Sequence, residues 1–561
     1  MASVRVSSTA TLSRRLAPHL LRAHNGLQQK SSVCNQTKMS TTTSSSFPPV
    51  LPVLTAACST PVYSGTTSRG AAEDIFFPHR SPPTPSSSST SKLPFAAARS
   101  GTSGGSKSKS FVLTRSCRTR TSTAINMFRN KIGGPPSNYS KNVFQHQTQA
   151  RSYTSYSELP EEVQMIREQA KQFTEDVLFQ TAAKNDVLHT FPKDEIKQLG
   201  ELGFLGMNVP EKYGGPGMSA LAYAVAMEEI SRGCPSCGLL LSINNSLYCG
   251  GLVYFGSEKQ KEEVLPGYLF GEKIGCFALS EPGNGSDAAA AATTAVEKDD
   301  HYLLNGTKQW ISNSYEGAST LVFATTDKQR KHKGISCFLV PLPNFPDENV
   351  AGSFSSSGVK LGQKEDKLGI RASSTAQVIM EDCQIPKENL VGQSGDGFKI
   401  AMKLLDGGRI GIAGQALGIA QASLECAVKY ANERYAFGEK IGKYYAVHEK
   451  LADMDLQIWS ARLLTWQAAC MKDRGEEFTR ASARCKYAAS KAATFCANEA
   501  IQILGGMGYV SDMPAERYFR DARITEIYEG TSEINKMVIG QKVLKEMTEV
   551  DIVLPAHYRA H

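Results

Sequence analysis

The sequence predicts an α+β fold in which a β-rich block lies between two α-rich blocks. Amphipathic helix periodicity begins near Leu159, short strand patterns fill the region after Ile274, and long Pro-poor helical patterns return from Phe398. Because helices and strands are segregated along the chain, an alternating α/β sheet is not expected. We predict an N-terminal helical domain at 151–273, a middle β-domain at 274–396 and a C-terminal helical domain at 397–561, after an extension at 1–150.

The extension has a composition of its own. Residues 1–150 contain 18 Lys plus Arg and two acids, a formal charge of +16, whereas the rest of the chain carries −8. No basic surface for nucleic acid is therefore expected on the folded part. The extension lacks the apolar periodicity that a core requires, so we expect it to be disordered and dispensable for catalysis. Its first 22 residues hold four arginines and no acid, which is typical of an organelle transit peptide. A plastid address and an unspecific low-complexity segment remain alternatives.

In the first helical block, apolar residues recur at spacings of three and four, which indicates an amphipathic helix: Val163, Ile166, Ala170, Phe173 and Val177. More helix is expected over 221–230 and 257–270. In the middle block, strands are expected over 302–304, 320–325, 335–341 and 377–380, because these segments are rich in β-branched or aromatic residues and end in turn residues. They predict a sheet or small barrel.

The last block predicts a helical bundle, with long helices over 417–434 and 451–471. No P-loop and no G-x-G-x-x-G after a strand is present, so a Rossmann-type site is not expected. No run reaches the roughly 18 apolar residues of a membrane span. The 13 cysteines have no framework spacing, which favours reduced thiols in an intracellular compartment. The C-x-x-C pair Cys234 and Cys237 has no second pair and no nearby His, so neither a metal site nor a functional dithiol is expected.

Chemistry-bearing motifs occur in four segments. Phe277 to Asp287 reads F-A-L-S-E-P-G-N-G-S-D, a turn where backbone N–H groups and hydroxyls can approach a ligand. Trp310-Ile311-Ser312 follows. Near the end come Q-I-L-G-G-M-G-Y, Gln502 to Tyr509, and R-D-A-R-I-T-E-I-Y-E-G-T-S-E-I, Arg520 to Ile534. Taken singly, each segment has an ordinary structural explanation, such as a plain turn or a core tryptophan.

In this order and at these separations, the four segments resemble those of the acyl-CoA dehydrogenases, from about Leu159 to Lys545. The resemblance implies a C-terminal four-helix domain, FAD held between that domain and the β-domain, and a homotetramer. It implies FAD contacts from Phe277, Ala278, Leu279, Ser280, Ser286, Trp310, Ile311, Ser312, Arg434, Gln502, Ile503, Leu504, Gly505, Gly506, Thr531, Ser532 and Glu533.

Some of these contacts would cross between subunits. The resemblance implies that Arg434 and residues 502–506 reach the FAD of a neighbouring subunit, and an arginine suits a pyrophosphate because its planar fork donates two parallel hydrogen bonds. One departure is visible, since this chain has Tyr445 where the family commonly has Gln. That difference puts one cofactor contact in doubt.

The resemblance also assigns the substrate site. Acyl-CoA contacts would come from Ser286, Asp406, Gly407, Gly408, Arg409 and Gly530, and Glu529 would be the base that removes the α-proton. Thr531 and Ser532 can cap a new helix, so the Glu529 carboxylate would lie on a turn where it can swing over a ligand. Desolvation there should raise its pKa toward the working range. Some relatives place the base at the position of Gly408, which has no side chain to supply it.

Three stretches resemble the short-chain (butyryl-CoA) branch: L-D-G-G-R-I-G-I-A, L-G-I-R-A-S-S-T-A and M-P-A-E-R. This resemblance implies oxidation of short-chain acyl-CoA to trans-2-enoyl-CoA in fatty-acid β-oxidation, with electron-transfer flavoprotein as acceptor, in the mitochondrial matrix. Two alternatives stay open, an acyl-CoA oxidase of related fold and a catalytically silent scaffold. The absence of a C-terminal S-K-L signal argues against the first, and intact Glu529 and Arg434 argue against the second.

Overall fold

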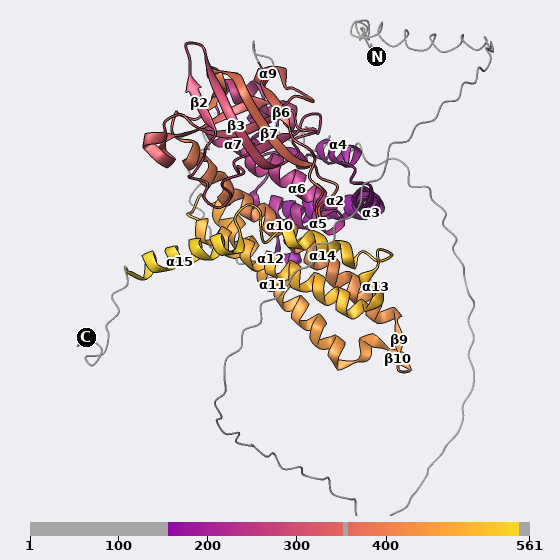
Figure 1. Ribbon diagram of the computed structural model, residues 1–561. Coiled ribbons are helices and arrows are strands. Elements are labelled where there is room, and N and C mark those ends of the chain that lie inside the picture. The colour runs from indigo at the N-terminus through magenta and orange to yellow at the C-terminus, as the bar shows by residue number, and fades with distance from the viewer. Residues whose placement is uncertain (1–154, 352–356, 549–561) are drawn as a thin grey trace, which may run out of the picture. The chain divides into compact units, whose positions relative to one another are not determined.

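The computed structural model describes residues 155–351 and 357–548 (Figure 1). Along the chain, a block of helices comes first, the strands of a β-sheet follow, and a second block of helices comes last. This order confirms the predicted α+β fold. All described elements belong to the compact unit Gly134–His561. The predicted extension at 1–150 lies outside the described residues.

The first helical block contains short and medium helices. They are α2 (Glu161–Phe173), α3 (Phe179–Leu188), α4 (Lys193–Glu201), α5 (Ala220–Gly233), α6 (Pro235–Ser242), α7 (Gly250–Phe255) and α8 (Glu258–Glu263). As predicted, α2 buries the face formed by Val163, Ile166, Ala170 and Phe173. The helix expected over 257–270 is shorter: a capping box of Ser257 and Gln260 starts α8, which ends at Glu263 before a single 3₁₀ turn at Leu265–Tyr268. Pro266 explains the break, because proline cannot donate within a helix.

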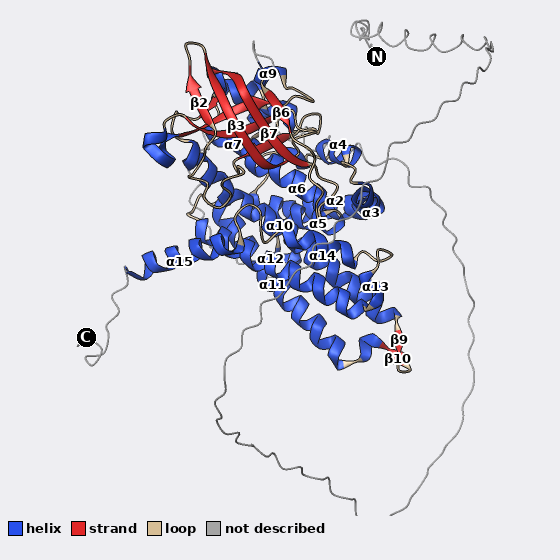
Figure 2. Cartoon of the chain, viewed as in Figure 1, coloured by secondary structure: helices blue, strands red, loops and turns tan. Residues whose placement is uncertain are grey.

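The β-domain is an eight-stranded sheet with the order β6-β7-β3-β2-β4-β5-β8, and β1 pairs with β4 (Figure 2). The strands are β1 (Gly275–Ala278), β2 (Thr294–Glu297), β3 (His301–Ser312), β4 (Ser319–Thr325), β5 (Ile335–Pro341), β6 (Val359–Leu361), β7 (Thr375–Pro386) and β8 (Leu390–Val391), and a short helix α9 (Glu348–Ala351) follows β5. β3 and β7 run 12 residues each, longer than the predicted segments. Their antiparallel pairing extends them past the stretches that are rich in β-forming residues.

Long helices form the last block: α10 (Gly397–Glu433), α11 (Tyr445–Asp473), α12 (Thr479–Leu504), α13 (Gly506–Tyr509), α14 (Ala515–Ile524) and α15 (Ser532–Thr548). A two-stranded hairpin of β9 (Tyr435–Ala436) and β10 (Glu439–Lys440) connects α10 to α11. Among the described residues, no helix is both long and apolar enough to cross a bilayer.

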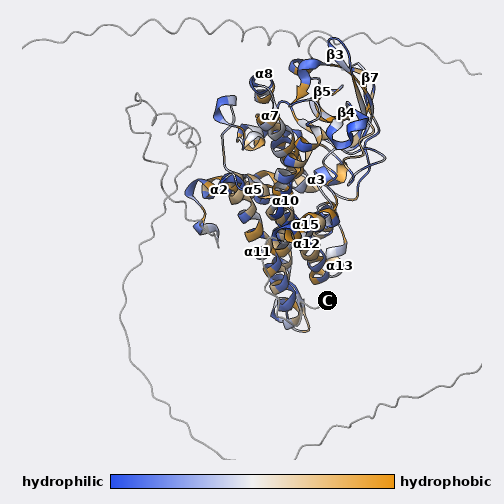
Figure 3. Cartoon of the chain, turned by 90° about the vertical axis from the view of Figure 1, so that its left-hand side faces the viewer, coloured by the Kyte–Doolittle hydropathy of each residue, from blue (hydrophilic) through white to orange (hydrophobic). Residues whose placement is uncertain are grey.

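Helix α10 is the central element, packed against α5, α11 and α12 (Figure 3). It starts well before the predicted segment 417–434 and ends at Glu433, so Arg434 lies just after it. Small residues allow the close packing: a Cβ on Gly418 would lie 2.4 Å from the Glu228 carbonyl oxygen of α5. Glycines lower helix propensity, but α10 is buried on every side over residues 407–420, and this burial keeps it helical.

Candidate active site

Glu529 lies on a tight turn between α14 and α15. Its backbone is left-handed, with φ +50°, and Gly530 follows with φ +96°. Thr531 caps α15, because its hydroxyl accepts a hydrogen bond from the Ile534 N–H at 3.2 Å. The predicted cap is therefore present, and the turn ends at Ser532, the first residue of α15.

The Glu529 carboxylate is shielded from solvent, and neither of its oxygens has a hydrogen-bond partner among the described residues. Burial raises the pKa of Glu529 to about 7, although the Lys486 and Arg409 cations oppose this rise. A carboxylate with this pKa can accept a proton near neutral pH, as a general base must. The backbone N–H of Glu529 likewise donates to no acceptor in the described part of the chain.

Glycine is required beside this carboxylate. A Cβ on Gly408 of α10 would lie 2.1 Å from Oε2 of Glu529. On the same helix, the buried Arg409 pairs with Asp406 at 2.5 Å, and Asp406 also accepts from the Thr479 hydroxyl at 2.7 Å. The structure thus brings together the predicted substrate residues 406–409, Glu529 and Gly530, which are separated by about 120 positions in the sequence.

The predicted flavin loop and Trp310 also meet. The Gln309 N–H donates to the Ser280 carbonyl at 2.9 Å, which ties the loop after β1 to β3. A register shift between Lys308 and Ile311 interrupts the β3–β7 pairing, and Trp310 within it is left-handed, with φ +63°. This bulge turns the indole outward, where it is 62% exposed, while Ile311 is buried. Trp310 is therefore not a core residue.

The remaining predicted residues of this region surround the loop. Phe277 and Ala278 lie in β1, Leu279 and Ser280 follow it, Ser286 is exposed, and Ser312 ends β3. Lys308 of β3 stabilises the loop, because its buried ammonium contacts the Glu281 carboxylate at 2.6 Å and the Leu279 carbonyl at 3.2 Å. We did not predict this ion pair, since a lysine in a strand and a glutamate in a turn give no sequence signal that they pair.

The hairpin β9–β10 and helix α13 lie at the end of the helical bundle away from the sheet (Figure 1). Arg434 directly precedes β9, and residues 502–506 end α12 and begin α13. Arg434, Gln502, Gly505 and Gly506 are exposed, and Ile503 and Leu504 are buried in α12. Tyr445, the departure from the family pattern, is the first residue of α11 and is 78% exposed. These residues therefore belong neither to the turn that carries Glu529 nor to the loop after β1.

The residues near Trp310 and Glu529 fit the predicted FAD. A large exposed aromatic suits the flavin ring, and the hydroxyls of Ser280, Ser286 and Ser312 have no hydrogen-bond partner among the described residues, so they are available to a ligand. No group of three or more metal-ligating side chains occurs in the described ranges. Cys234 and Cys237 are both buried and reduced.

The sequence analysis did not identify the residues that hold the turn around Glu529 in place. Lys486 of α12 donates to the carbonyls of Tyr528 and Gly530, and the Tyr528 hydroxyl donates to Gln415 of α10. A signal existed for Lys486, because it occupies a helical position between Ala483 and Ala489 on the buried face of α12. No such signal existed for Gln415.

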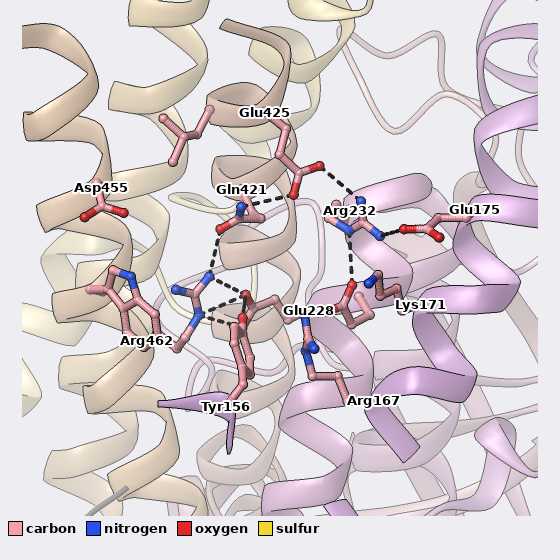
Figure 4. Close-up of a pocket in the computed structure, with 13 residues that line it drawn as sticks. Tyr156, Arg167, Lys171, Glu175, Glu228, Arg232, Gln421, Glu425, Asp455 and Arg462 are labelled. Carbon is pink, nitrogen blue, oxygen red and sulfur yellow. Dashed lines mark hydrogen bonds and ion pairs between the residues drawn. The ribbon is translucent and has the colours of Figure 1, made fainter. Parts of the chain in front are cut away.

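A charged pocket of about 450 Å³ lies apart from these residues, between α2, α5, α10 and α11 (Figure 4). Most of its charges already pair: Arg462 contacts Glu228 at 2.6 Å, and Arg232 contacts Glu175, Glu229 and Glu425. None of the predicted site residues lines it. We therefore attribute the pocket to helix packing rather than to substrate binding.

The described part of the chain matches a known protein family over most of its length. Three family models match: acyl-CoA dehydrogenase N-terminal domain at 160–272, middle domain at 276–383 and C-terminal domain at 395–544. This chain belongs to the acyl-CoA dehydrogenase family. As a member of the family, it is an oxidoreductase of the acyl-CoA dehydrogenase type.

Individual acyl-CoA dehydrogenases narrow the comparison. The mitochondrial short-chain specific acyl-CoA dehydrogenase of Rattus norvegicus is 58% identical over 70% of this chain and 93% of its own length. That of Homo sapiens is 56% identical over 69% and 91%. The solved butyryl-CoA dehydrogenase of Megasphaera elsdenii is 41% identical, covers 69% of this chain and 99% of its own, and has a TM-score of 0.65. The similarity thus lies in the short-chain branch.

Proposed function

We propose that this protein dehydrogenates short-chain acyl-CoA thioesters to trans-2-enoyl-CoA, with Glu529 as the base that removes the α-proton. One observation supports this most strongly: the Glu529 carboxylate is buried without a hydrogen-bond partner in the described residues, and burial raises its pKa to about 7. An acyl thioester has a weakly acidic α C–H, so its removal needs a base that is ionised, desolvated and free of competing donors.

FAD is the cofactor we propose. When bound, it supplies the acceptor for the hydride that leaves the β-carbon. Trp310 and Ser312 would pack beside its ring, and residues 277–286 would contact it through backbone and hydroxyl groups. Thr531, Ser532 and Glu533 would add contacts from the start of α15.

The chain's own groups would then handle the substrate. Glu529 takes the α-proton on its carboxylate, and its free backbone N–H donates to the thioester carbonyl, which stabilises the charge that develops there. Asp406 and Arg409, linked by an ion pair one turn apart, line the acyl-CoA site with Gly407, Gly408 and Gly530. Ser286 adds a hydroxyl from the flavin loop.

The partners follow from the same proposal. Electrons pass to an electron-transfer flavoprotein, and a solved chain that is 44% identical, with a TM-score of 0.66, comes from a structure described as electron transferring flavoprotein of Acidaminococcus fermentans. Arg434 and residues 502–506, of which Gln502, Gly505 and Gly506 are exposed like Arg434, would complete the FAD site of a second subunit in a homotetramer. We propose the mitochondrial matrix as the location, and the word mitochondrial in the names of the rat and human relatives supports the organelle.

The test uses flavin-loaded protein without oxygen. Added butyryl-CoA should bleach the flavin absorbance, with the highest kcat/KM for four carbons, less for six, and little for eight carbons or for branched isovaleryl-CoA. Glu529→Gln should keep its flavin and bind butyryl-CoA but lose about 10²–10⁴-fold in rate, because the amide cannot accept the proton. Activity of this variant within threefold of wild type would rule out Glu529 as the base. An optimum at eight carbons or more would rule out the short-chain assignment alone.

A further inference from the structure

Lys486 is a buried lysine behind the turn that carries Glu529. It lies on α12, its side chain is inaccessible to solvent, and its ammonium contacts no carboxylate in the described part of the chain. Lysines are almost never fully buried without a charged partner, because removing an ammonium from water is costly. A buried ammonium therefore needs hydrogen-bond acceptors that offset the cost of its burial.

Its contacts are the two carbonyls on either side of Glu529. Lys486 Nζ lies 2.9 Å from the Tyr528 oxygen and 2.5 Å from the Gly530 oxygen. Both carbonyls therefore face the same ammonium. Glu529 between them has a left-handed backbone, which a residue with a Cβ adopts only where its surroundings enforce it. The two hydrogen bonds from the ammonium thus stabilise the strained backbone of the turn that carries the Glu529 carboxylate.

Other contacts fix the ends of the turn. The Tyr528 hydroxyl donates to Gln415, and the Asn535 amide donates to the Gly530 carbonyl at 2.9 Å. Lys486 is the contact that bridges the two sides of Glu529 itself, and it alone among these brings a positive charge.

We propose that Lys486 is a positioning residue for the base: it holds the Tyr528–Gly530 turn closed over its ammonium and so aims the Glu529 carboxylate at the substrate. This inference rests on the proposed role of Glu529. Lys486 touches neither the reacting atoms nor the carboxylate, so it acts through the backbone and through its charge.

The charge predicts a direction for the pH dependence. The charged groups that act on Glu529 are Lys486 and Arg409, and Tyr223 and Tyr528 also face it. Burial lowers the pKa of Lys486 to about 7, and the charges of Glu529, Arg409, Glu526 and Cys485 also act on it. Its two carbonyl acceptors favour the ammonium form. Removing this cation removes a stabiliser of the Glu529 carboxylate, so the pKa of Glu529 should rise further.

Two variants separate the clamp from the charge. Lys486→Met removes both, whereas Lys486→Gln removes the charge and keeps an amide donor. In the flavin-loaded enzyme, both should shift the acid limb of the kcat/KM profile up by about 1 pH unit. Lys486→Met should also lower kcat by about 10–100-fold, because small displacements of a reacting group have large effects, and Lys486→Gln should lower it less. KM for butyryl-CoA and flavin content should change little.

The matched control is Lys491→Met, on the same helix and with the same charge change. Lys491 is half-exposed and pairs with Glu526, which keeps Thr494 and Arg523 as partners. It should leave the acid limb and kcat unchanged. An unshifted acid limb in both Lys486 variants would overturn the proposal, as would loss of flavin or folding in both, which would assign Lys486 to stability. If Glu529→Gln were itself active, the proposed base would fail instead, so the two failures are distinguishable.

Discussion

The residue scale shows how much of the site depends on one side chain's surroundings. Glu529 combines a left-handed backbone, a buried carboxylate and a raised pKa. The strained backbone and the buried charge cost free energy that an ordinary surface glutamate does not lose. Burial among side chains of α10 and α12 raises the pKa, while the Lys486 and Arg409 cations limit that rise. Strain and unsatisfied groups of this kind concentrate at functional sites.

The pKa of Glu529 predicts the acid limb of the enzyme's pH profile. Burial raises it to about 7, and the base works only when ionised, so kcat/KM should fall about tenfold per pH unit below pH 7 and level off above it. An exposed glutamate would instead lose activity only below about pH 4.3. The measurement is kcat/KM for butyryl-CoA from pH 5 to 9 at constant ionic strength. A flat profile between pH 5.5 and 8 would contradict the raised pKa.

Gly408→Ala should lower activity while leaving the fold intact. The new methyl group would meet Oε2 of Glu529 at 2.1 Å and Leu247 at 3.2 Å, and the flexible carboxylate is the atom that can move away. We expect kcat to fall by about tenfold or more, because the base is displaced from its productive position. Gly540→Ala, whose added Cβ would meet nothing within 4 Å, is the control. A Gly408→Ala enzyme with wild-type kcat would show that this contact is not needed.

At the element scale, α5, α10 and α11 are joined by charge as well as by apolar packing. Arg462 of α11 and Glu228 of α5 form a buried ion pair at 2.6 Å, and Tyr156 and Gln421 add hydrogen bonds to it. The pair lies beside the charged pocket of Figure 4. Buried pairs of this kind fix how helices pack, but they leave a costly charge behind when one partner is lost.

Arg462→Met should therefore destabilise the protein by about 3–5 kcal/mol, because Glu228 would remain buried without its cation. Adding Glu228→Gln to the same chain should recover part of that loss. Arg480→Met, which breaks the exposed pair with Glu546, should cost less than about 1 kcal/mol. Urea unfolding of the three variants decides the matter. Equal effects of Arg462→Met and Arg480→Met would contradict the role of the buried pair.

At the scale of the whole molecule, a single chain leaves aromatic side chains and the proposed FAD-binding residue Arg434 exposed to solvent. Around the hairpin and α13, Phe437 is 97% exposed, Tyr509 84% and Tyr445 78%. Arg434 lies between α10 and this hairpin. Exposed aromatic side chains gathered at one end of a molecule favour an interface with another chain.

Arg434→Ala should weaken flavin retention and loosen the oligomer together, since we propose that Arg434 binds the FAD of a neighbouring subunit. Size-exclusion chromatography with flavin absorbance should show smaller species that contain less flavin than wild type. Arg474→Ala, an exposed arginine paired with Glu476 at the end of α11, should change neither property. A fully flavin-loaded tetramer of Arg434→Ala would count against the shared site.

The sequence by itself determined the fold class and the family, and it named Glu529 as the residue we propose to be the base. Helix periodicity, strand composition and four motifs are local properties, so they survive without knowledge of packing. Element lengths were less predictable, because the burial of α10 and the pairing of β3 with β7 extend these elements beyond their local preferences.

Only the tertiary structure decided which residues surround Glu529. Gly408, Gln415 and Lys486 lie 43 to 121 positions away from it, and no sequence pattern states that α10 and α12 meet at this turn. The same holds for the pKa of Glu529, since desolvation depends on atoms from several helices rather than on neighbours in the chain. The sequence proposes Glu529 as the base, and the packing of α10 and α12 around its turn supplies the burial that raises its pKa.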